Sequence, residues 1–248
     1  MSKVSKTKAV IFDYIGTLVN CRSYSMEASR EKLYNALADA GFSAGKDEFL
    51  EAYIKAHEKY RIIRYEQLRE VTNAVWVAEA LNQIGYEINA DDSRVKSALN
   101  VFFKDYVDSL TLRADAKKLL KKASEQYKLG LVSNFTHAPV VYSSLKQLGI
   151  SKFFNVIVVS EANGWRKPSK NIFNDALGKL QVEAHEAVYV GDSPIEDIKG
   201  AKEFGLRTVF VGSQFCKLND LLVSKQEPDF RFNDLEEVCK NFEEIVGS

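Results

Sequence analysis

Asp13 stands where a carboxylate could do chemistry. It follows the apolar run 9–12 (AVIF) and precedes Gly16 and Thr17. A short β-branched run of this kind predicts a buried parallel strand, and the carboxyl ends of such strands open onto the ligand crevice of an α/β sheet. A carboxylate placed there can attack an electrophile or bind a cation. An isolated aspartate more often simply ends a strand, so the functional interpretation depends on further signals.

Three further polar signals follow in order, each at the end of a strand-like run or in the loop beyond it. They are Ser133 with Asn134, Lys167 in the segment WRKPS, and Asp192 with Asp197 in the segment VYVGDSPIED. Taken without Asp13, the two later aspartates equally suit a cap on the helix expected after them. Taken with Asp13, they favour a site for a divalent cation.

The elements that must position these residues alternate from residue 114 onward. Helices are expected over 114–126, 139–148, 169–180, 194–204 and 235–245, and strands over 128–132, 154–159, 187–190, 207–211 and 229–232. Strands separated by helices of this length predict βαβ units and a parallel sheet. The fold class is therefore α/β.

The intervening region is predicted to be helical throughout. Apolar residues recur at helical spacing over 25–40, 47–60, 66–82 and 91–110, after a linker at 20–24. Four amphipathic helices without a strand signal predict a small bundle. Because the first strand precedes this bundle and its sheet partners follow it, we expect a core of residues 1–20 and 111–248 with residues 21–110 inserted.

Composition limits the partners. The chain has 248 residues, with 34 Lys plus Arg and 34 Asp plus Glu. This balance disfavours nucleic acid, which normally selects a basic excess. Three scattered cysteines suit a reducing cytoplasm better than a disulfide framework. The apolar run before Asp13 is too short for a signal peptide or a membrane span, so we expect a cytoplasmic protein without a membrane partner.

The four signals, in this order, resemble the motifs of the haloacid dehalogenase-like hydrolases. The resemblance covers residues 9–18 and roughly 112–211. It implies a Rossmann-like parallel sheet with an inserted α-helical cap, and hydrolysis of a small phosphoester through a covalent intermediate on Asp13.

The resemblance also implies residue roles. Mg²⁺ would be bound by Asp13, the backbone carbonyl of Ile15 and Asp192, with Asp197 supporting them. Lys167 would offset charge in the transition state. Substrate contacts would come from Gly16, Thr17, Ser133 and Asn134.

The sequence departs from the family pattern at Ile15, where most family phosphatases carry an aspartate that acts as general acid and base. Isoleucine cannot transfer a proton, and loss of such a group typically costs ~10²–10⁴ in rate. In a phosphatase, another group would supply the proton, or the leaving group would need little help. The candidate donors are Tyr24, Glu27 and His137.

Three alternatives remain open. A 2-haloacid dehalogenase also lacks the second aspartate, and its carboxylate substrate would be bound by an arginine; the candidates are Arg22, Arg30, Arg61 and Arg64. A hydrolase resembling phosphonoacetaldehyde hydrolase would need a cap lysine for a Schiff base; the candidates are Lys32, Lys46, Lys55 and Lys59. A third possibility is a catalytically reduced binding module.

Overall fold

The computed structural model describes residues 6–247, and its centre is a six-stranded parallel sheet. The strands are β1 (Ala9–Phe12), β4 (Lys128–Ser133), β5 (Val156–Val159), β6 (Ala187–Gly191), β7 (Arg207–Val211) and β8 (Phe230–Phe232). Their order across the sheet is β5-β4-β1-β6-β7-β8. Ile11 of β1 pairs with Gly130 on one side and Tyr189 on the other. The first strand therefore lies in the middle, between strands that come more than a hundred residues later.

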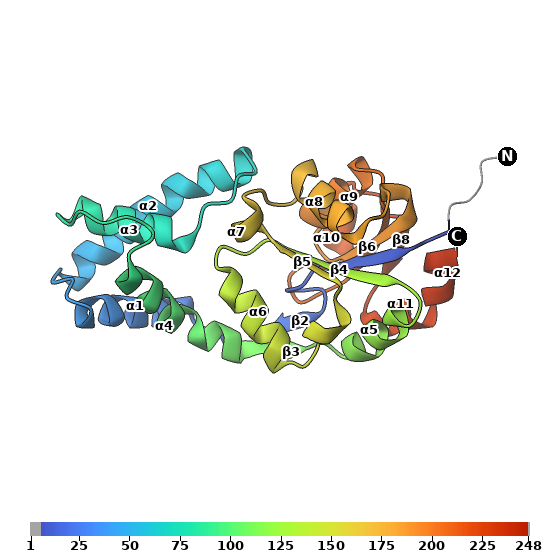
Figure 1. Cartoon of the computed structure of the whole chain (residues 1–248), viewed down its shortest axis with the longest axis horizontal. Coiled ribbons are helices and arrows are strands. Elements are labelled where there is room, and N and C mark those ends of the chain that lie inside the picture. Colours follow the sequence, from blue (N-terminus) through green and yellow to red (C-terminus); the bar gives the residue numbers. More distant parts are fainter. Residues whose placement is uncertain (1–5, 248) are drawn as a thin grey trace.

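Helices cover both faces of the sheet (Figure 1). One face packs against α5 (Ala116–Ser124), α6 (Ala138–Gln147), α11 (Leu235–Lys240) and α12 (Phe242–Gly247), and the other against α8 (Lys170–Leu180) and α9 (Gly200–Glu203). Alternate residues of a strand point to opposite faces, so Val10 and Phe12 join the first layer while Ala9 and Ile11 join the second. This three-layer arrangement confirms the predicted α/β, Rossmann-like core.

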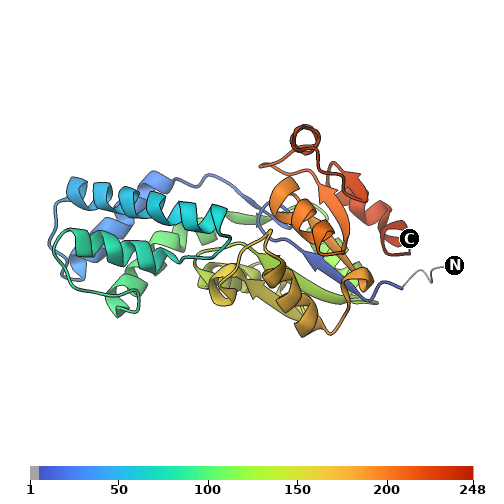
Figure 2. The ribbon, with the colours of Figure 1, turned by 90° about the horizontal axis from the view of Figure 1, so that it is seen from above.

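Four helices form a lobe beyond the end of the sheet to which β1 points (Figures 1 and 2). They are α1 (Met26–Asp39), α2 (Lys46–Glu66), α3 (Asn73–Gln83) and α4 (Ser93–Ser109). Helix α1 packs on α4 and α2 packs on α3. Among residues 6–247, none of the helices has the length and apolar character needed to cross a membrane.

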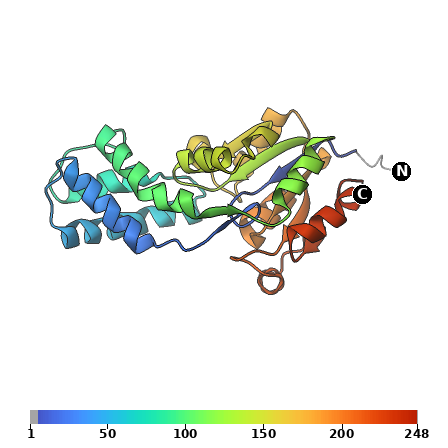
Figure 3. The same cartoon turned by 90° about the horizontal axis from the view of Figure 1, so that it is seen from below.

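The lobe joins the sheet through a ribbon that the sequence did not predict. Strands β2 (Val19–Cys21) and β3 (Leu110–Leu112) pair antiparallel, and Asn20 lies opposite Thr111. The two segments that connect the lobe to the sheet domain therefore run side by side, as the view from below also shows (Figure 3). The predicted linker at 20–24 was wrong in its first two residues, because three-residue strands are too short to show a period.

The predicted third helix, 66–82, was wrong over its first turns. Glu66 ends α2, Leu68 has a positive φ of 55°, and α3 starts only at Asn73. The backbone of this loop binds the segment before Lys167 instead: the Arg166 amide donates to the Leu68 carbonyl at 3.0 Å, and the Glu70 amide donates to the Gly164 carbonyl at 3.0 Å. Tertiary contacts thus override the helical periodicity.

Other boundaries also differ. The predicted helix 194–204 is a π-helix, Pro194–Lys199, followed by α9. The predicted helix 235–245 breaks into α11 and α12 at Asn241, whose amide donates to the Glu237 carbonyl at 2.8 Å and so competes with the helical backbone. Two short helices were not predicted: α7 (Ser160–Asn163) and α10 (Leu218–Ser224).

Candidate active site

Three carboxylates meet at the carboxyl edge of the sheet. Asp13 follows β1, Asp192 follows β6, and Asp197 lies in the π-helix; one oxygen of each lies within 4.8 Å of the others. Their exposed fractions are 7%, 5% and 1%. Burying three negative charges together is unfavourable unless cations balance them. The cluster therefore requires a nearby positive charge to be stable.

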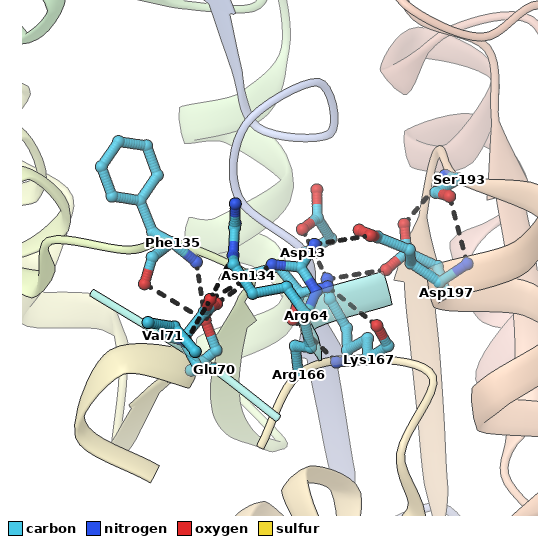
Figure 4. Close-up of polar contacts among 12 residues, drawn as sticks. Asp13, Arg64, Glu70, Val71, Asn134, Phe135, Arg166, Lys167, Ser193 and Asp197 are labelled. Carbon is cyan, nitrogen blue, oxygen red and sulfur yellow. Dashed lines mark hydrogen bonds and ion pairs between the residues drawn. The ribbon is translucent and has the colours of Figure 1, made fainter. Parts of the chain in front are cut away.

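Lys167 supplies one cation (Figure 4). Its Nζ lies 2.7 Å from Asp13 Oδ1 and 2.7 Å from Asp197 Oδ1, and it donates to the Val132 carbonyl at 2.9 Å. It also lies 3.0 Å from the Tyr189 hydroxyl. Burial alone would lower the pKa of Lys167, but the two carboxylates raise it well above its ordinary value. The ammonium is thus charged at neutral pH and fixed against Asp13.

The second oxygen of Asp13 is free to react. Asp13 Oδ2 is buried and has no hydrogen-bond partner among the described residues. The backbone amide of Asp13 donates to the Val190 carbonyl at 2.9 Å, which fixes the residue at the end of the strand. One carboxylate oxygen is therefore held by Lys167 while the other is left for a metal ion or a reacting atom.

Asp192 is held by two hydroxyls. Thr17 Oγ1 donates to its Oδ1 at 3.1 Å, and Ser213 Oγ donates to its Oδ2 at 2.6 Å. Gly16, at φ 103°, lies so close that a Cβ atom there would overlap the carboxylate. Burial, followed by the charge of Asp13, raises the pKa of Asp192 well above its ordinary value. The Asp192 carboxylate thus also lacks a balancing cation.

Asp197 is positioned by the turn that carries it. The Ser193 amide donates to Asp197 Oδ2 at 2.9 Å, and the Tyr189 hydroxyl donates to Oδ1 at 3.1 Å. Burial raises the pKa of Asp197, although Lys167 lowers it in part. Sequence reasoning missed Tyr189 and Ser213; the only signal for Ser213 was its place just after a strand, beside the predicted site.

This donor set fits a hard divalent cation. The three carboxylates offer oxygen atoms only, which is the preference of Mg²⁺, and one of those oxygens has no other partner. Burial and the charge of Asp13 raise the pKa of Asp192, so a bound cation would stabilise its charged form. The predicted contribution of the Ile15 carbonyl stays a prediction.

Ser133 and Asn134 lie where β4 ends. Ser133 is 2% exposed. The amide of Asn134 binds the backbone of Lys167 twice, accepting from its N–H at 2.7 Å and donating to its carbonyl at 3.0 Å. Asn134 therefore positions Lys167. The substrate contacts predicted for Gly16, Thr17, Ser133 and Asn134 stay predictions.

A cavity of ≈ 450 Å³ lies between the sheet and the helical lobe. We call it the catalytic cavity because Ile15 and Asn134, the sequence neighbours of the carboxylate cluster and of Ser133, line it; Asp13, Asp192, Asp197 and Lys167 are not among its lining residues. The sheet side contributes Ile15 and Asn134, and the lobe contributes Arg64 and Tyr106. Ile15 is thus an apolar lining residue of this cavity.

A buried ionic network, absent from the sequence predictions, ties the lobe to the core beside this cavity (Figure 4). The Glu70 side chain is fully buried, accepts from Arg64 Nε at 2.7 Å and from Arg166 at 3.1 Å, and accepts from the Ser160 hydroxyl. Arg166 also binds Glu196 at 3.0 Å. Charged residues in loops usually indicate solvated surface, so the sequence held no signal for this network.

The predicted proton donors are dispersed. Glu27 is exposed on α1, and Tyr24 lines a different cavity inside the lobe. His137 lines a third cavity and stacks on Phe103 at 4.8 Å; burial lowers its pKa to about 4. Among the described residues, no lysine lines either the catalytic cavity or the cavity that contains Tyr24.

Comparison with known proteins places these features in a family. A sequence model of the haloacid dehalogenase-like hydrolases matches residues 7–205. The chain is 32% identical to a glyceraldehyde 3-phosphate phosphatase of Methanopyrus kandleri over 82% of each chain.

Two solved structures share the fold. A 2-haloacid dehalogenase from Pseudomonas syringae pv. Tomato has a TM-score of 0.66 at 20% identity, with 97% of this chain and 98% of that chain covered. The putative hydrolase YfnB from Bacillus subtilis, bound to magnesium, has a TM-score of 0.58 at 22% identity, with 98% and 100% covered.

Proposed function

Because the chain belongs to the haloacid dehalogenase-like hydrolase family, we propose that this hydrolase is a Mg²⁺-dependent phosphatase of a small phosphorylated metabolite. The observation that carries the proposal is the cluster of Asp13, Asp192 and Asp197 with Lys167 against it. A dehalogenase has no need of three clustered carboxylates, since its substrate brings no phosphoryl charge to be neutralised. The phosphatase relative from Methanopyrus kandleri supports the same class of reaction.

In the first step, the Asp13 carboxylate attacks phosphorus, and the bond from phosphorus to the leaving oxygen breaks, so that the leaving group departs as an oxyanion and takes its proton from solvent. Asp13 Oδ1 stays bound to Lys167, so the carboxylate keeps its orientation. Water then attacks the aspartyl phosphate and releases inorganic phosphate, which restores the carboxylate. The Lys167 ammonium offsets negative charge on the phosphoryl oxygens, and Asn134 holds that lysine in place.

Mg²⁺ fits at Asp13, Asp192 and Asp197. When bound, it would reduce the repulsion between these carboxylates and the phosphoryl group. The magnesium in the similar YfnB structure supports this assignment. Thr17 and Ser213 orient Asp192 for the same purpose.

We further propose that residues 21–110 act as a cap that excludes water and selects the substrate. Arg64 and Tyr106 of the lobe line the catalytic cavity directly. The reducing cytoplasm is the proposed compartment, and the three cysteines are free.

A parallel assay tests the function. An aryl phosphate, a set of sugar phosphates and 2-chloropropionate are each incubated with the protein in Mg²⁺ or in EDTA. We expect phosphate release in Mg²⁺ alone. Chloride release in EDTA would indicate a dehalogenase instead, and borohydride inactivation with phosphonoacetaldehyde would indicate a Schiff base. Binding without turnover of any compound would indicate a binding module.

A further inference from the structure

A second cavity, which we call the cap pocket, lies inside the helical lobe and has a volume of ≈ 270 Å³. It adjoins the catalytic cavity, and the two share Arg64, Tyr106, Phe135 and Thr136 as lining residues. Tyr106 also lies near enough to Asp13 for that carboxylate to add to the effect of burial in raising the Tyr106 pKa. The two cavities therefore share one wall, and Tyr106 on that wall lies near the carboxylate cluster.

The cap pocket contains polar atoms without partners. Within residues 6–247, Arg30 Nε, Asn73 Oδ1 and Trp76 Nε1 are buried and make no hydrogen bond of ordinary length and angle, although all three side chains lie close to the Tyr53 hydroxyl. Asn73 is 4% exposed and Trp76 is 2% exposed. A buried donor or acceptor left unpaired is destabilising, and a group of them in one cavity is typical of a binding site.

These atoms converge on one place. Burial raises the pKa of Tyr53, while the nearby side chains of Trp76, Arg30 and Asn73 lower it, so all three lie close to its hydroxyl. The Arg30 guanidinium lies 5.8 Å from the centre of the Tyr53 ring. Two donors and one acceptor thus surround a single point at the back of the pocket.

The charge of the pocket is positive. Its basic lining residues are Arg30, Arg64 and His57, and its described lining includes no aspartate or glutamate. Arg64 is paired with Glu70, whereas Arg30 has no carboxylate partner among residues 6–247. By contrast, the exposed Arg61 on α2 pairs with Glu58. A half-buried arginine without a counterion selects an anion.

We propose that the cap pocket binds a second anionic group of the substrate, a carboxylate or a phosphate, through Arg30 and Trp76. Asn73 Oδ1 would accept from a hydroxyl next to that group. The substrate class is then a phosphoester with an acidic group at its far end. This inference rests on the proposed function, because it takes the scissile phosphate to lie at Asp13.

The test uses two matched series of probes. One contains ω-phosphooxy carboxylates and α,ω-alkanediol bisphosphates of two to five carbons, and the other contains ω-hydroxyalkyl phosphates of the same lengths. At the best length, we expect kcat/KM to be at least tenfold higher for the acidic compound. Arg30→Gln should abolish that preference, Trp76→Phe should reduce it, and Arg61→Gln is the control that retains it. The two kinds of acidic compound distinguish carboxylate from phosphate.

Binding is measured separately, without turnover. Trp165→Phe leaves Trp76 as the remaining tryptophan, so its fluorescence reports on the cap pocket. Titration of this fluorescence gives a dissociation constant for each probe. We expect the acidic probes to bind at least tenfold more tightly than the neutral ones. Thermal unfolding checks that each variant is folded.

The outcomes separate the two proposals. Turnover of both series without a preference, or a preference that folded Arg30→Gln retains, would overturn the cap-pocket inference and leave the phosphatase intact. Tight binding of acidic probes that Arg30→Gln abolishes, without turnover of any phosphoester, would uphold the pocket and overturn the phosphatase.

Discussion

Ile15 is the residue that decides which phosphoesters the site can use. Its side chain lines the catalytic cavity where a proton donor is expected, and it has no proton to give. Phenolates leave without protonation, whereas alkoxides do not. The wild-type protein should therefore hydrolyse p-nitrophenyl phosphate faster than glycerol 3-phosphate.

We predict that Ile15→Asp raises kcat for glycerol 3-phosphate by about 10²-fold, since a general acid contributes ~10²–10⁴. The rate with p-nitrophenyl phosphate should change much less. Ile15→Asn is the matched control, because it is polar and of similar size but cannot transfer the proton. Equal rates for Ile15→Asp and Ile15→Asn on the alkyl ester would mean that another group already supplies the proton.

His137 gives the fold a pH dependence. Burial lowers its pKa from the ordinary 6.5 to about 4 in the folded protein. Between these pH values the unfolded chain binds more protons, so the free energy of unfolding should fall as the pH drops from about 6.5 to about 4. His137→Phe preserves the stacking on Phe103 and should reduce this acid sensitivity.

Urea denaturation at a series of pH values measures the His137 effect. Substitution of the exposed His185 by Gln serves as the control and should leave the pH profile as in the wild type. If His137→Phe does not alter the dependence of the unfolding free energy on pH, the acid sensitivity does not come from His137.

Sequence reasoning selected the candidate site residues because they end strands, and the structure brings three of them, Asp13, Asp192 and Asp197, within 4.8 Å of one another. Asp13 and Asp192 follow apolar runs, and their residue types and their order along the chain match the motifs of a hydrolase family. Tyr189 and Glu70 could not be found in this way. Tyr189 lies inside a strand where an aromatic residue usually only packs, and Glu70 lies in a segment whose periodicity predicts a helix.

At the scale of elements, the loop between α2 and α3 is the main contact of the lobe with the Lys167 segment. Glu70 holds two arginines there with its side chain fully buried. Removing one partner of a buried pair leaves the other charge uncompensated, which typically costs about 3–5 kcal/mol.

We predict that Glu70→Ala lowers the free energy of unfolding by about 3–5 kcal/mol and raises KM, because the loop lies beside Lys167. Urea denaturation and steady-state kinetics measure the two effects. Glu58→Ala removes an exposed ion pair with Arg61, which water and salt screen, and should leave the free energy of unfolding nearly unchanged. Similar losses for the two variants would show that the buried network does not hold the lobe.

The elements themselves were predictable to different degrees. The sheet strands were located within a few residues because their apolar runs are bounded by turns and helices. The β2–β3 ribbon, the start of α3 and the π-helix were not, because each depends on contacts with distant segments. The Asp197 carboxylate of the π-helix, for example, accepts from Lys167 Nζ at 2.7 Å, although Lys167 lies thirty residues earlier in the chain.

At the scale of the whole molecule, the topology brings distant residues together. β1 lies between β4 and β6, so Asp13 lies close to Asp192 although the two residues are 179 positions apart in the sequence. The α/β class could be predicted from the alternation of elements. The contacts between lobe and core could not, because Glu70, Arg166 and the two adjoining cavities leave no periodic signal.

Acid-quench mass spectrometry of the Asp13 peptide tests the central claim most directly. The protein is mixed with p-nitrophenyl phosphate in Mg²⁺ or in EDTA, quenched within one turnover and digested. We predict that the wild-type peptide gains one phosphoryl group in Mg²⁺ only, and that Asp13→Asn gains none. Release of phosphate without that adduct at any time, or an adduct that forms equally in EDTA, would contradict the account.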